Sequence, residues 1–375
     1  MTDERPAAVG AGESCAARWW RSMARGEVEP EGPAWILVGI LTLASLLYGV
    51  VASVVLWLRG RRPTRFDVPV ISVGNVVVGG AGKTPLVVHL ARLLQGRGRS
   101  VAVVSRGYGR EGRELVVVTR GDRPRIDWRR AGDEPYLTAL LTREVAVVAS
   151  ARRAEGVRYA VEKLGADVIL LDDAFQHVQV ARSLDILVAD AARPFGNGYL
   201  LPAGPLREPP AGIRRADLVV GTRCAGDAAE LRGIVGTLAP GVPVVLTRMK
   251  PVELWDVATG DRIRLKELRG RPVVALSSIA NPRDFERTLV RIGLDVVDHC
   301  VFPDHHGYGD DDLDGVASVA ARAGAEVVLT TEKDAVRLDR WRNPPRLVAL
   351  GIEVEIVEGE AVLDRAIESV VTGGK

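Results

Sequence analysis

A glycine-rich stretch followed by Lys-Thr carries the residue types that bind phosphate. The stretch VPVISVGNVVVGGAGKTPL, which begins at residue 68, has three glycines directly before the Lys-Thr pair. Glycines let backbone N–H groups turn toward phosphate oxygens, the lysine neutralises β- and γ-phosphate charge, and the threonine hydroxyl ligates Mg²⁺. The sequence therefore predicts a nucleoside triphosphate site formed by Val77, Val78, Gly79, Gly80, Ala81, Gly82, Lys83 and Thr84.

The first position of this loop departs from the usual phosphate-loop pattern. That pattern has a glycine five residues before the second glycine, and Val77 occupies the position here. Gly79 and Gly80 supply the same flexibility two residues later. The alternative is a tight strand-to-helix turn that contains Gly-Lys-Thr by chance.

A second motif favours the phosphate interpretation. The stretch ADVILLDDAFQH, residues 166–177, is an apolar strand that ends in Asp172 and Asp173. Aspartates at the end of a strand beside a phosphate loop hold Mg²⁺ directly or through water. An acidic turn after a buried strand is common by itself, but it is less expected about 90 residues after Gly-Lys-Thr in an α/β pattern. The sequence thus predicts ATP and Mg²⁺ as cofactors, with Thr84, Asp172 and Asp173 at the metal.

The stretch SRGYGREG, residues 105–112, has the glycine spacing of a dinucleotide-binding fingerprint. The residues that follow it, RELVVVTRG, have the pattern of a strand, whereas the fingerprint must open a helix. NAD and FAD are therefore excluded here. Arg106 and Tyr108, together with Asn75, are instead candidates to contact the substrate or its phosphate, and a plain β-hairpin is the alternative for the stretch.

Further polar clusters could take part in proton transfer. Asp133 in GDEP precedes an expected helix, where an N-cap role is the alternative. FPDHHGYGDDDL, from residue 302, contains Asp304, His305 and His306, in which a carboxylate–histidine pair could act in proton transfer. Neighbouring histidines rarely bind one ion, so metal ligation is the weaker interpretation. The next three aspartates, 310–312, complement the start of a helix. Glu332, Lys333 and Asp334 follow a strand, where they fit a ligand site or a solvated turn equally well.

Short apolar runs alternate with helical patterns and predict a parallel α/β sheet. A β-ribbon is expected around residues 240–262, and a second α/β series follows it. The fold prediction is two α/β domains, the first a P-loop NTPase-like parallel sheet, joined by a β-ribbon linker. The predicted parts are a loosely structured N-terminus (1–33), an apolar membrane-associated helix (34–58), a P-loop kinase domain (59–224), a linker (225–265) and a second α/β domain (266–375).

The predicted apolar helix, residues 34–58, contains no charged residue. It would be about 37 Å long, enough to cross a hydrocarbon core of about 30 Å. Trp35 and Trp57 mark its ends, and four arginines follow it between residues 59 and 65. This charge bias places the large C-terminal part in the cytoplasm. A cleaved signal peptide fits poorly, and length does not separate spanning the bilayer from lying in its interface.

Composition narrows the choice of partners. The net charge of +2 gives no global basic field of the kind that would make nucleic acid the main partner. The three cysteines are far apart and form no CxxC motif, which favours a reduced compartment and argues against structural zinc. No obligate protein partner is evident from the sequence.

Taken in order, the motifs resemble those of the tetraacyldisaccharide 4′-kinase family, the lipid A 4′-kinases of Gram-negative bacteria. The resemblance covers about residues 34–338, and it departs at Ala81, Ala174 and the stretch ALSSIANP, from residue 275. The motifs that carry it are an apolar N-terminal segment, VPVISVGNVVVGGAGKTP, SRGYG, GDEP, DDAFQH, LLPAGPLREP (200–209), RRAD (214–217), FPDHHGY and TTEKDAVRL.

The resemblance implies phosphoryl transfer from ATP to the 4′-hydroxyl of an acylated glucosamine disaccharide 1-phosphate. It implies an active site in the cleft between the two domains, at the cytoplasmic face of the bacterial inner membrane. Asp133 and His305 would form the pair that takes the hydroxyl proton, and Lys83 would stabilise the moving phosphoryl group. A membrane-bound ATPase that drives a partner protein, or a kinase of another amphiphile, are the competing classes.

Overall fold

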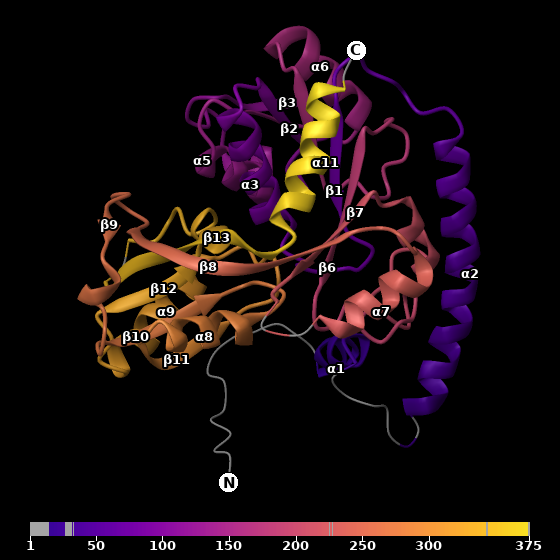
Figure 1. Cartoon of the computed structure of the whole chain (residues 1–375). Coiled ribbons are helices and arrows are strands. Elements are labelled where there is room, and N and C mark those ends of the chain that lie inside the picture. Colours follow the sequence, from indigo (N-terminus) through magenta and orange to yellow (C-terminus); the bar gives the residue numbers. More distant parts are fainter. Residues whose placement is uncertain are drawn as a thin grey trace. The chain divides into compact units, whose positions relative to one another are not determined.

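The computed structural model describes residues 15–26, 32, 34–224, 226, 228–342 and 344–373. The chain divides into two compact units (Figure 1). The N-unit comprises Ala16–Met249 and Val354–Lys375, and the C-unit comprises Met1–Cys15 and Lys250–Glu353. The chain passes between the units within two long strands, β8 (Val244–Asp256) and β13 (Arg346–Glu358).

The N-unit is built on a sheet whose strands are parallel, except that the edge strand runs antiparallel to its neighbour. Nearly all strand residues are buried on both sides, which explains their continuous apolar sequences. In hydrogen-bonded order the strands are β8, β7 (Leu218–Thr222), β6 (Leu184–Asp190), β1 (Val70–Gly74), β5 (Val168–Asp172), β2 (Val101–Ser105), β4 (Ala146–Ala149) and β3 (Val116–Arg120).

Helices cover both faces of this sheet. Alternate strand residues such as Ile71 and Leu170 pack on one face, and their neighbours such as Ile169 and Leu171 pack on the other. The first face carries α3 (Lys83–Gly96), α4 (Trp128–Ala131), α5 (Asp133–Leu141) and α11 (Glu360–Thr372). The opposite face carries α6 (Arg153–Leu164), the 3₁₀ helix η1 (Pro210–Arg215) and α7 (Ala229–Leu238).

The C-unit has its own parallel strands with a helix on each face. Their order is β11 (Asp295–Val301), β10 (Pro272–Ser277), β12 (Val327–Thr331) and β13, with α8 (Pro282–Arg291) on one face and α9 (Asp310–Arg322) on the other. Smaller elements are β9 (Arg262–Ile263), η2 (Leu265–Glu267) and α10 (Glu332–Ala335). The predicted β-ribbon corresponds to β8 and β9, which pair antiparallel.

The predicted division of the chain differs from the observed one at its C-terminal end. The second domain was expected to run from residue 266 to residue 375, but residues from Val354 onward belong to the N-unit. The reason is packing, because Leu363, Ile367 and Val370 of α11 are buried in the same core as the helices beside β1. The alternative of a plain β-hairpin around residues 105–112 is also wrong, since the strand after this stretch, β3, pairs with β4, and β2 lies between β5 and β4.

The N-terminal residues are more ordered than predicted where the structure describes them. Helix α1 (Cys15–Ala24) lies inside the segment expected to be loosely structured. The Trp20 indole donates a hydrogen bond to the Pro202 carbonyl at 2.7 Å, which fixes the helix to the N-unit. The other residues of 1–33 lie outside the described part of the chain, except 25, 26 and 32.

The apolar segment forms one long helix, α2 (Ala34–Gly60), long and apolar enough to cross a membrane. It runs along the side of the N-unit (Figure 1). Its less exposed positions recur at helical spacing, so one face contacts the N-unit. Large apolar side chains point outward on the rest of its surface: Trp35, Ile36, Leu37, Ile40, Leu43, Leu46, Leu47, Val50, Val51, Val54, Trp57 and Leu58.

Gly74, at the end of β1, has no room for a side chain. A Cβ atom there would lie 2.4 Å from the backbone nitrogen of Phe175. We expect Gly74→Ala to lower the free energy of unfolding by about 1–3 kcal/mol, because backbone on both sides must shift. Gly96→Ala is the matched control, since nothing lies within 4 Å of its added Cβ. Urea unfolding of both variants checks this, and equal stabilities would contradict the close packing.

Candidate active site

The predicted phosphate loop joins β1 to α3 at the carboxyl end of the parallel sheet. Gly79 and Gly82 have φ angles of 104° and 80°, values that glycine adopts without strain. Gly82 also precedes the first residue of α3, which is Lys83. Helix α3 therefore directs its N-terminus, with its partial positive charge, at this loop.

Two side chains at the end of β7 orient the peptide groups of the loop. Thr222 Oγ1 donates to the Ala81 carbonyl at 2.9 Å, and Arg223 donates to the Gly80 carbonyl at 2.5 Å. In a trans peptide the next residue's N–H points away from the carbonyl. The N–H groups of Ala81 and Gly82 are consequently directed away from β7, as an anion-binding loop requires.

Val77 and Val78, predicted to contact the nucleotide, lie where the loop pairs with another segment of the N-unit. The Val78 N–H donates to the Pro205 carbonyl at 2.8 Å, and Arg207 N–H donates to the Val76 carbonyl at 2.8 Å. These bonds form an antiparallel bridge between Val77 and Leu206. The Val78 N–H is thus already bonded within the protein.

Lys83 is held in a buried cluster of polar groups. Its Nζ atom donates to Asn75 Oδ1 at 3.1 Å and lies 3.2 Å from Asp173 Oδ1. Arg207 contacts both oxygens of Asp173 at 3.1 Å. Although burial opposes ionisation, Lys83 and Arg207 lower the pKa of Asp173 to about 2. Asp173 is therefore a carboxylate that holds two cations in place.

Asp172 is the neighbouring carboxylate and differs in its surroundings. Ser105 Oγ donates to its Oδ2 atom at 3.3 Å, while Oδ1 is buried and has no hydrogen-bond partner among the described residues. Burial, followed by the charges of Glu134 and Asp173, raises its pKa to about 7, against the opposing influence of Lys83 and Arg153. A buried carboxylate oxygen without a partner fits a hard cation such as Mg²⁺.

Asn75 lies beside Lys83 and is itself fully buried. Gln176 Nε2 donates to the Asn75 carbonyl and to Glu208 Oε1, both at 2.8 Å. Arg215 completes the chain by contacting Glu208 at 2.8 Å. Asn75, predicted to contact the substrate, thus has a direct contact with the lysine of the phosphate loop.

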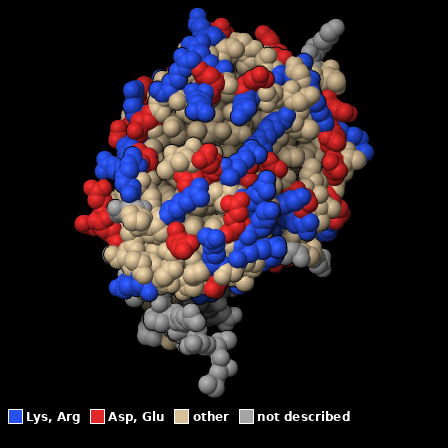
Figure 2. All heavy atoms as spheres, turned by 90° about the vertical axis from the view of Figure 1, so that its left-hand side faces the viewer, with Lys and Arg blue, Asp and Glu red and all other residues tan. Residues whose placement is uncertain are grey.

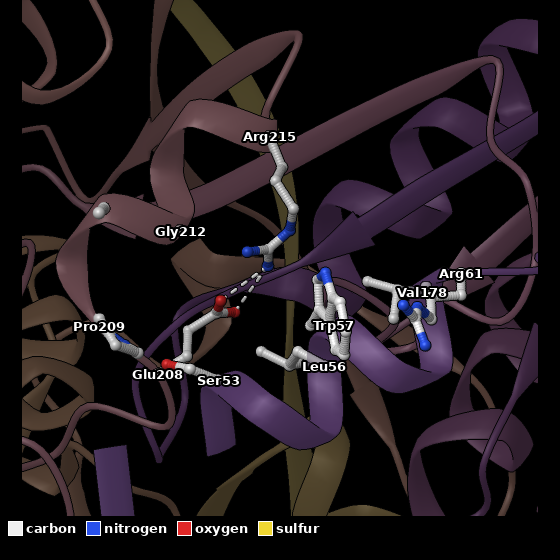
Figure 3. Close-up of a pocket in the computed structure, with 11 residues that line it drawn as sticks. Ser53, Leu56, Trp57, Arg61, Val178, Glu208, Pro209, Gly212 and Arg215 are labelled. Atoms are coloured by element: carbon white, nitrogen blue, oxygen red, sulfur yellow. Dashed lines mark hydrogen bonds and ion pairs between the residues drawn. The ribbon is translucent and has the colours of Figure 1, made fainter. Parts of the chain in front are cut away.

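A pocket of about 630 Å³ opens beside Glu208 and Arg215 (Figure 3). Helix α2 forms its other side with Leu56 and Trp57. The Arg61 guanidinium lies 3.9 Å from the centre of the Trp57 ring. The pocket therefore combines apolar surface of helix α2 with charged groups from other parts of the N-unit.

The remaining predicted site residues of the N-unit differ in their solvent exposure. Arg106 is exposed and Tyr108 is 65% exposed, on the loop after β2. Asp133 is buried and is the first residue of α5, so Gly132 occupies the N-cap position. Asp133 Oδ1 accepts a hydrogen bond from the Glu134 N–H at 2.9 Å.

The C-unit carries a separate polar cluster around His305. Lys333 Nζ lies 3.0 Å from His305 Nε2, and Asp304 is 4.0 Å from the same nitrogen. His306 instead contacts Asp312 at 2.9 Å and stacks on Phe302. His306 is therefore held by Asp312 and Phe302, whereas His305 adjoins Lys333 and Asp304.

A buried aspartate organises the segment that carries His305. Asp334 accepts hydrogen bonds from the N–H and Oγ of Ser278 at 3.0 and 2.6 Å, and from Thr331 at 2.8 Å. The Ser278 carbonyl in turn accepts the His305 N–H at 3.2 Å. The sequence left open whether Asp334 belongs to a ligand site or to a solvated turn, and the structure shows that it is buried and hydrogen-bonded to Ser278 and Thr331. Lys333, from the same motif, contacts His305.

Sequence reasoning missed several residues that the structure places in these clusters. The buried Arg153 donates to the Ser150 carbonyl and to the Asp172 carbonyl at 3.4 Å. Arg207 and Glu208 lie in LLPAGPLREP, a stretch that supported the family resemblance but to which no site residue was assigned. Arg153 has no signal in the sequence, because an arginine at a helix start is ordinarily exposed.

The face shown in Figure 2 carries basic and acidic side chains in alternation. Blue and red groups are interspersed, and tan surface separates them. This face therefore presents both signs of charge.

The parallel sheet, the glycine loop at the start of α3 and the aspartates at the end of β5 define a P-loop phosphotransferase class of protein. The model of the tetraacyldisaccharide-1-P 4′-kinase family matches residues 37–372. The chain therefore belongs to this family, and it is a kinase.

Relatives and a solved structure agree with that assignment. The tetraacyldisaccharide 4′-kinase of Anaeromyxobacter dehalogenans (strain 2CP-C) is 44% identical over 94% of each chain. That of Geobacter sulfurreducens is 41% identical over 85% of this chain and 89% of its own. The crystal structure of Aquifex aeolicus LpxK in complex with ATP matches with a TM-score of 0.72 and 33% identity, over 89% of this chain and 99% of that chain.

Proposed function

We propose that the chain transfers the γ-phosphate of ATP to the 4′-hydroxyl of a tetraacyldisaccharide 1-phosphate, using the cluster around Lys83. The observation that carries this proposal is the placement of the Lys83 ammonium at the mouth of a glycine loop on a helix N-terminus. In the proposed site, backbone N–H groups from Gly79 to Gly82 hold the phosphates. Lys83 neutralises charge on the transferred group, the main form of catalysis for phosphoryl transfer.

Mg²⁺ fits the residues present at this site. Asp172 offers a buried oxygen with no partner among the described residues, and the Thr84 hydroxyl lies in the first turn of α3. Mg²⁺ usually takes one or two protein oxygens together with phosphate oxygens, and when bound it shields the charge between phosphates. We assign Asp172 and Thr84 to the metal, while Asp173 fixes Lys83 and Arg207.

Asp133 and His305 are proposed to take the proton of the sugar hydroxyl. Asp133 belongs to the N-unit and His305 to the C-unit. Lys333 Nζ lies 3.0 Å from His305 Nε2, which places a cation beside the proposed base. Neutral imidazole is the form that accepts a proton.

Arg106 and Tyr108 are proposed to contact the headgroup of the substrate, which they can reach because they are exposed. The pocket between α2 and Glu208 is a suitable place for part of an amphiphile. Its Leu56 and Trp57 walls suit acyl methylenes, and Arg61 suits an anionic group.

Helix α2 is proposed to lie in the membrane interface at the cytoplasmic face of the bacterial inner membrane. Its inner face is bonded to the N-unit from Ser45 to Tyr48, and its outer face is apolar. A helix that crossed the bilayer in this arrangement would place polar loop backbone at the same depth, which is unfavourable. An interfacial helix keeps the acyl chains in lipid while the headgroup reaches the kinase site.

Incubation of the full chain with γ-labelled ATP, Mg²⁺ and the acylated disaccharide in vesicles tests the proposal. We expect the label to appear in the lipid at its 4′ position. Label found only in free phosphate would favour the competing ATPase class and contradict the proposed transfer. A second incubation with a different amphiphile in place of the disaccharide tests the alternative kinase class.

A further inference from the structure

The segment Leu200–Arg207 of the N-unit is bonded to the membrane-type helix on one side. Ser45 Oγ lies 2.8 Å from both the Leu200 carbonyl and the Leu41 carbonyl of its own helix, so these two acceptors share its one hydrogen, and it accepts the Ala203 N–H at 3.0 Å. Tyr48 donates its hydroxyl hydrogen to the Arg207 carbonyl at 2.9 Å. These contacts come from the middle of α2 and from its inner face.

The same segment is bonded to the phosphate loop on its other side. The Pro205 carbonyl and the Arg207 N–H form the bridge with Val78 and Val76 described above, each bond 2.8 Å long. The Arg207 guanidinium then reaches Asp173, and Asp173 reaches Lys83 at 3.2 Å. A continuous series of bonds thus joins the apolar helix α2 to the lysine of the proposed nucleotide site.

We propose that α2 is a positioning element of the kinase site, with Tyr48 and Ser45 as its positioning residues. Arg207 has its carbonyl fixed by Tyr48 and its N–H fixed by Val76, so both backbone groups beside its Cα are held. Because its backbone is fixed, the Arg207 side chain has a defined origin from which its guanidinium contacts and orients Asp173. The inference rests on the proposed function of Lys83 and extends it to residues outside the phosphate loop.

Close contact along α2 makes this connection stiff. Ser45 and Gly49 are the buried residues of the helix, and a Cβ at Gly49 would lie 2.6 Å from Leu200 Cδ1. The glycine lets the helix approach the segment closely enough for Tyr48 to reach a backbone carbonyl. A helix that served solely as a membrane attachment would need its outer apolar face, but not these inward hydroxyl groups.

The test compares hydroxyl deletions in the full chain bound to vesicles. Tyr48→Phe and the double variant Ser45→Ala/Tyr48→Phe remove the inward bonds and leave the outer face of α2 unchanged. Thr42→Val is the matched control, because the Thr42 hydroxyl donates within the helix to the Val38 carbonyl. The measurements are the affinity for a non-hydrolysable ATP analogue, kcat and KM for ATP, vesicle co-sedimentation and the unfolding temperature.

We expect Tyr48→Phe to weaken analogue binding or lower kcat by about three- to tenfold, as for loss of one neutral hydrogen bond. The double variant should show about tenfold or more, with vesicle binding equal to that of the unmodified chain. Thr42→Val should match the unmodified chain. Unchanged affinity and kcat in the double variant would overturn the proposal, as would an equal loss in Thr42→Val or a loss that only follows detachment from vesicles.

Failure of the proposed function would look different from failure of this inference. If the unmodified chain formed no phosphorylated lipid, the substrate assignment would fall while analogue affinity still measured the effect of Tyr48. If the lipid product formed normally and Tyr48→Phe changed neither affinity nor kcat, the positioning role would fall alone.

Discussion

Replacement of Lys83 by alanine is expected to reduce lipid phosphorylation by about a thousandfold or more. The ammonium is 3.2 Å from Asp173 and lies at the helix terminus where the phosphoryl charge would develop. Its loss removes charge stabilisation in a buried site, where water cannot replace it. Initial rates at saturating ATP and lipid measure the effect.

Lys163→Ala, an exposed lysine in the last turn of α6, is the matched control and should leave the rate unchanged. The fold should survive Lys83→Ala, because Arg207 still contacts both oxygens of Asp173. His305→Ala should cost less, about ten- to a hundredfold, since a general base contributes little to a loose phosphoryl-transfer state. A Lys83→Ala rate above a tenth of the unmodified rate, or equal rates in both variants, would refute the proposed site.

Asp172→Asn is expected to abolish the dependence of ATP binding on Mg²⁺ and to lower the rate about a hundredfold or more. The carboxylate must be ionised to bind the cation, and its pKa is raised to about 7. In the unmodified chain, Mg²⁺ affinity should therefore fall about tenfold per pH unit below pH 7 and level off above it. Titration of the metal at pH 6, 7 and 8 measures this trend.

Asp172→Asn should lower the rate but should not lower the stability of the fold. This difference separates a role in metal binding from a role in folding. Because the folded pKa of Asp172 exceeds the unfolded value, the folded state holds more protons and its stability falls as pH rises toward 7. Asparagine carries no charge, so Asp172→Asn should unfold at an equal or higher temperature than the unmodified chain at pH 7.5. A variant that is both inactive and less stable would indicate that Asp172 supports the fold.

Much of this fold follows from local sequence patterns. The strands that end at Gly74, Ser105 and Asp172 were predictable because parallel strands buried on both faces have continuous apolar sequences. The glycine turn between β1 and α3 was predictable because glycines between an apolar strand and a helical pattern allow the chain to change direction. In both cases the physical cause lies within a few residues of the chain.

What could not be predicted depends on residues far apart in the sequence. Arg207 approaches Asp173 only after the segment before it pairs with the phosphate loop, and no local pattern encodes that pairing. Placement of Asn75 against Lys83 likewise depends on how β1 and α3 are joined. The roles of Asp133 and His305 rest on the resemblance, because no local pattern pairs two residues that lie about 170 positions apart in the chain.

The return of the chain to the N-unit after Glu353 affects how the protein can be made. Helix α11 supplies Leu363, Ile367 and Val370 to the core beside β1, so the N-unit lacks part of its interior until these residues have left the ribosome. Cutting the gene after residue 249 would therefore release an incomplete N-unit with exposed apolar surface. A chain released from a ribosome that stalled before residue 360 would expose the same apolar surface, and proteases that degrade incomplete chains would recognise it.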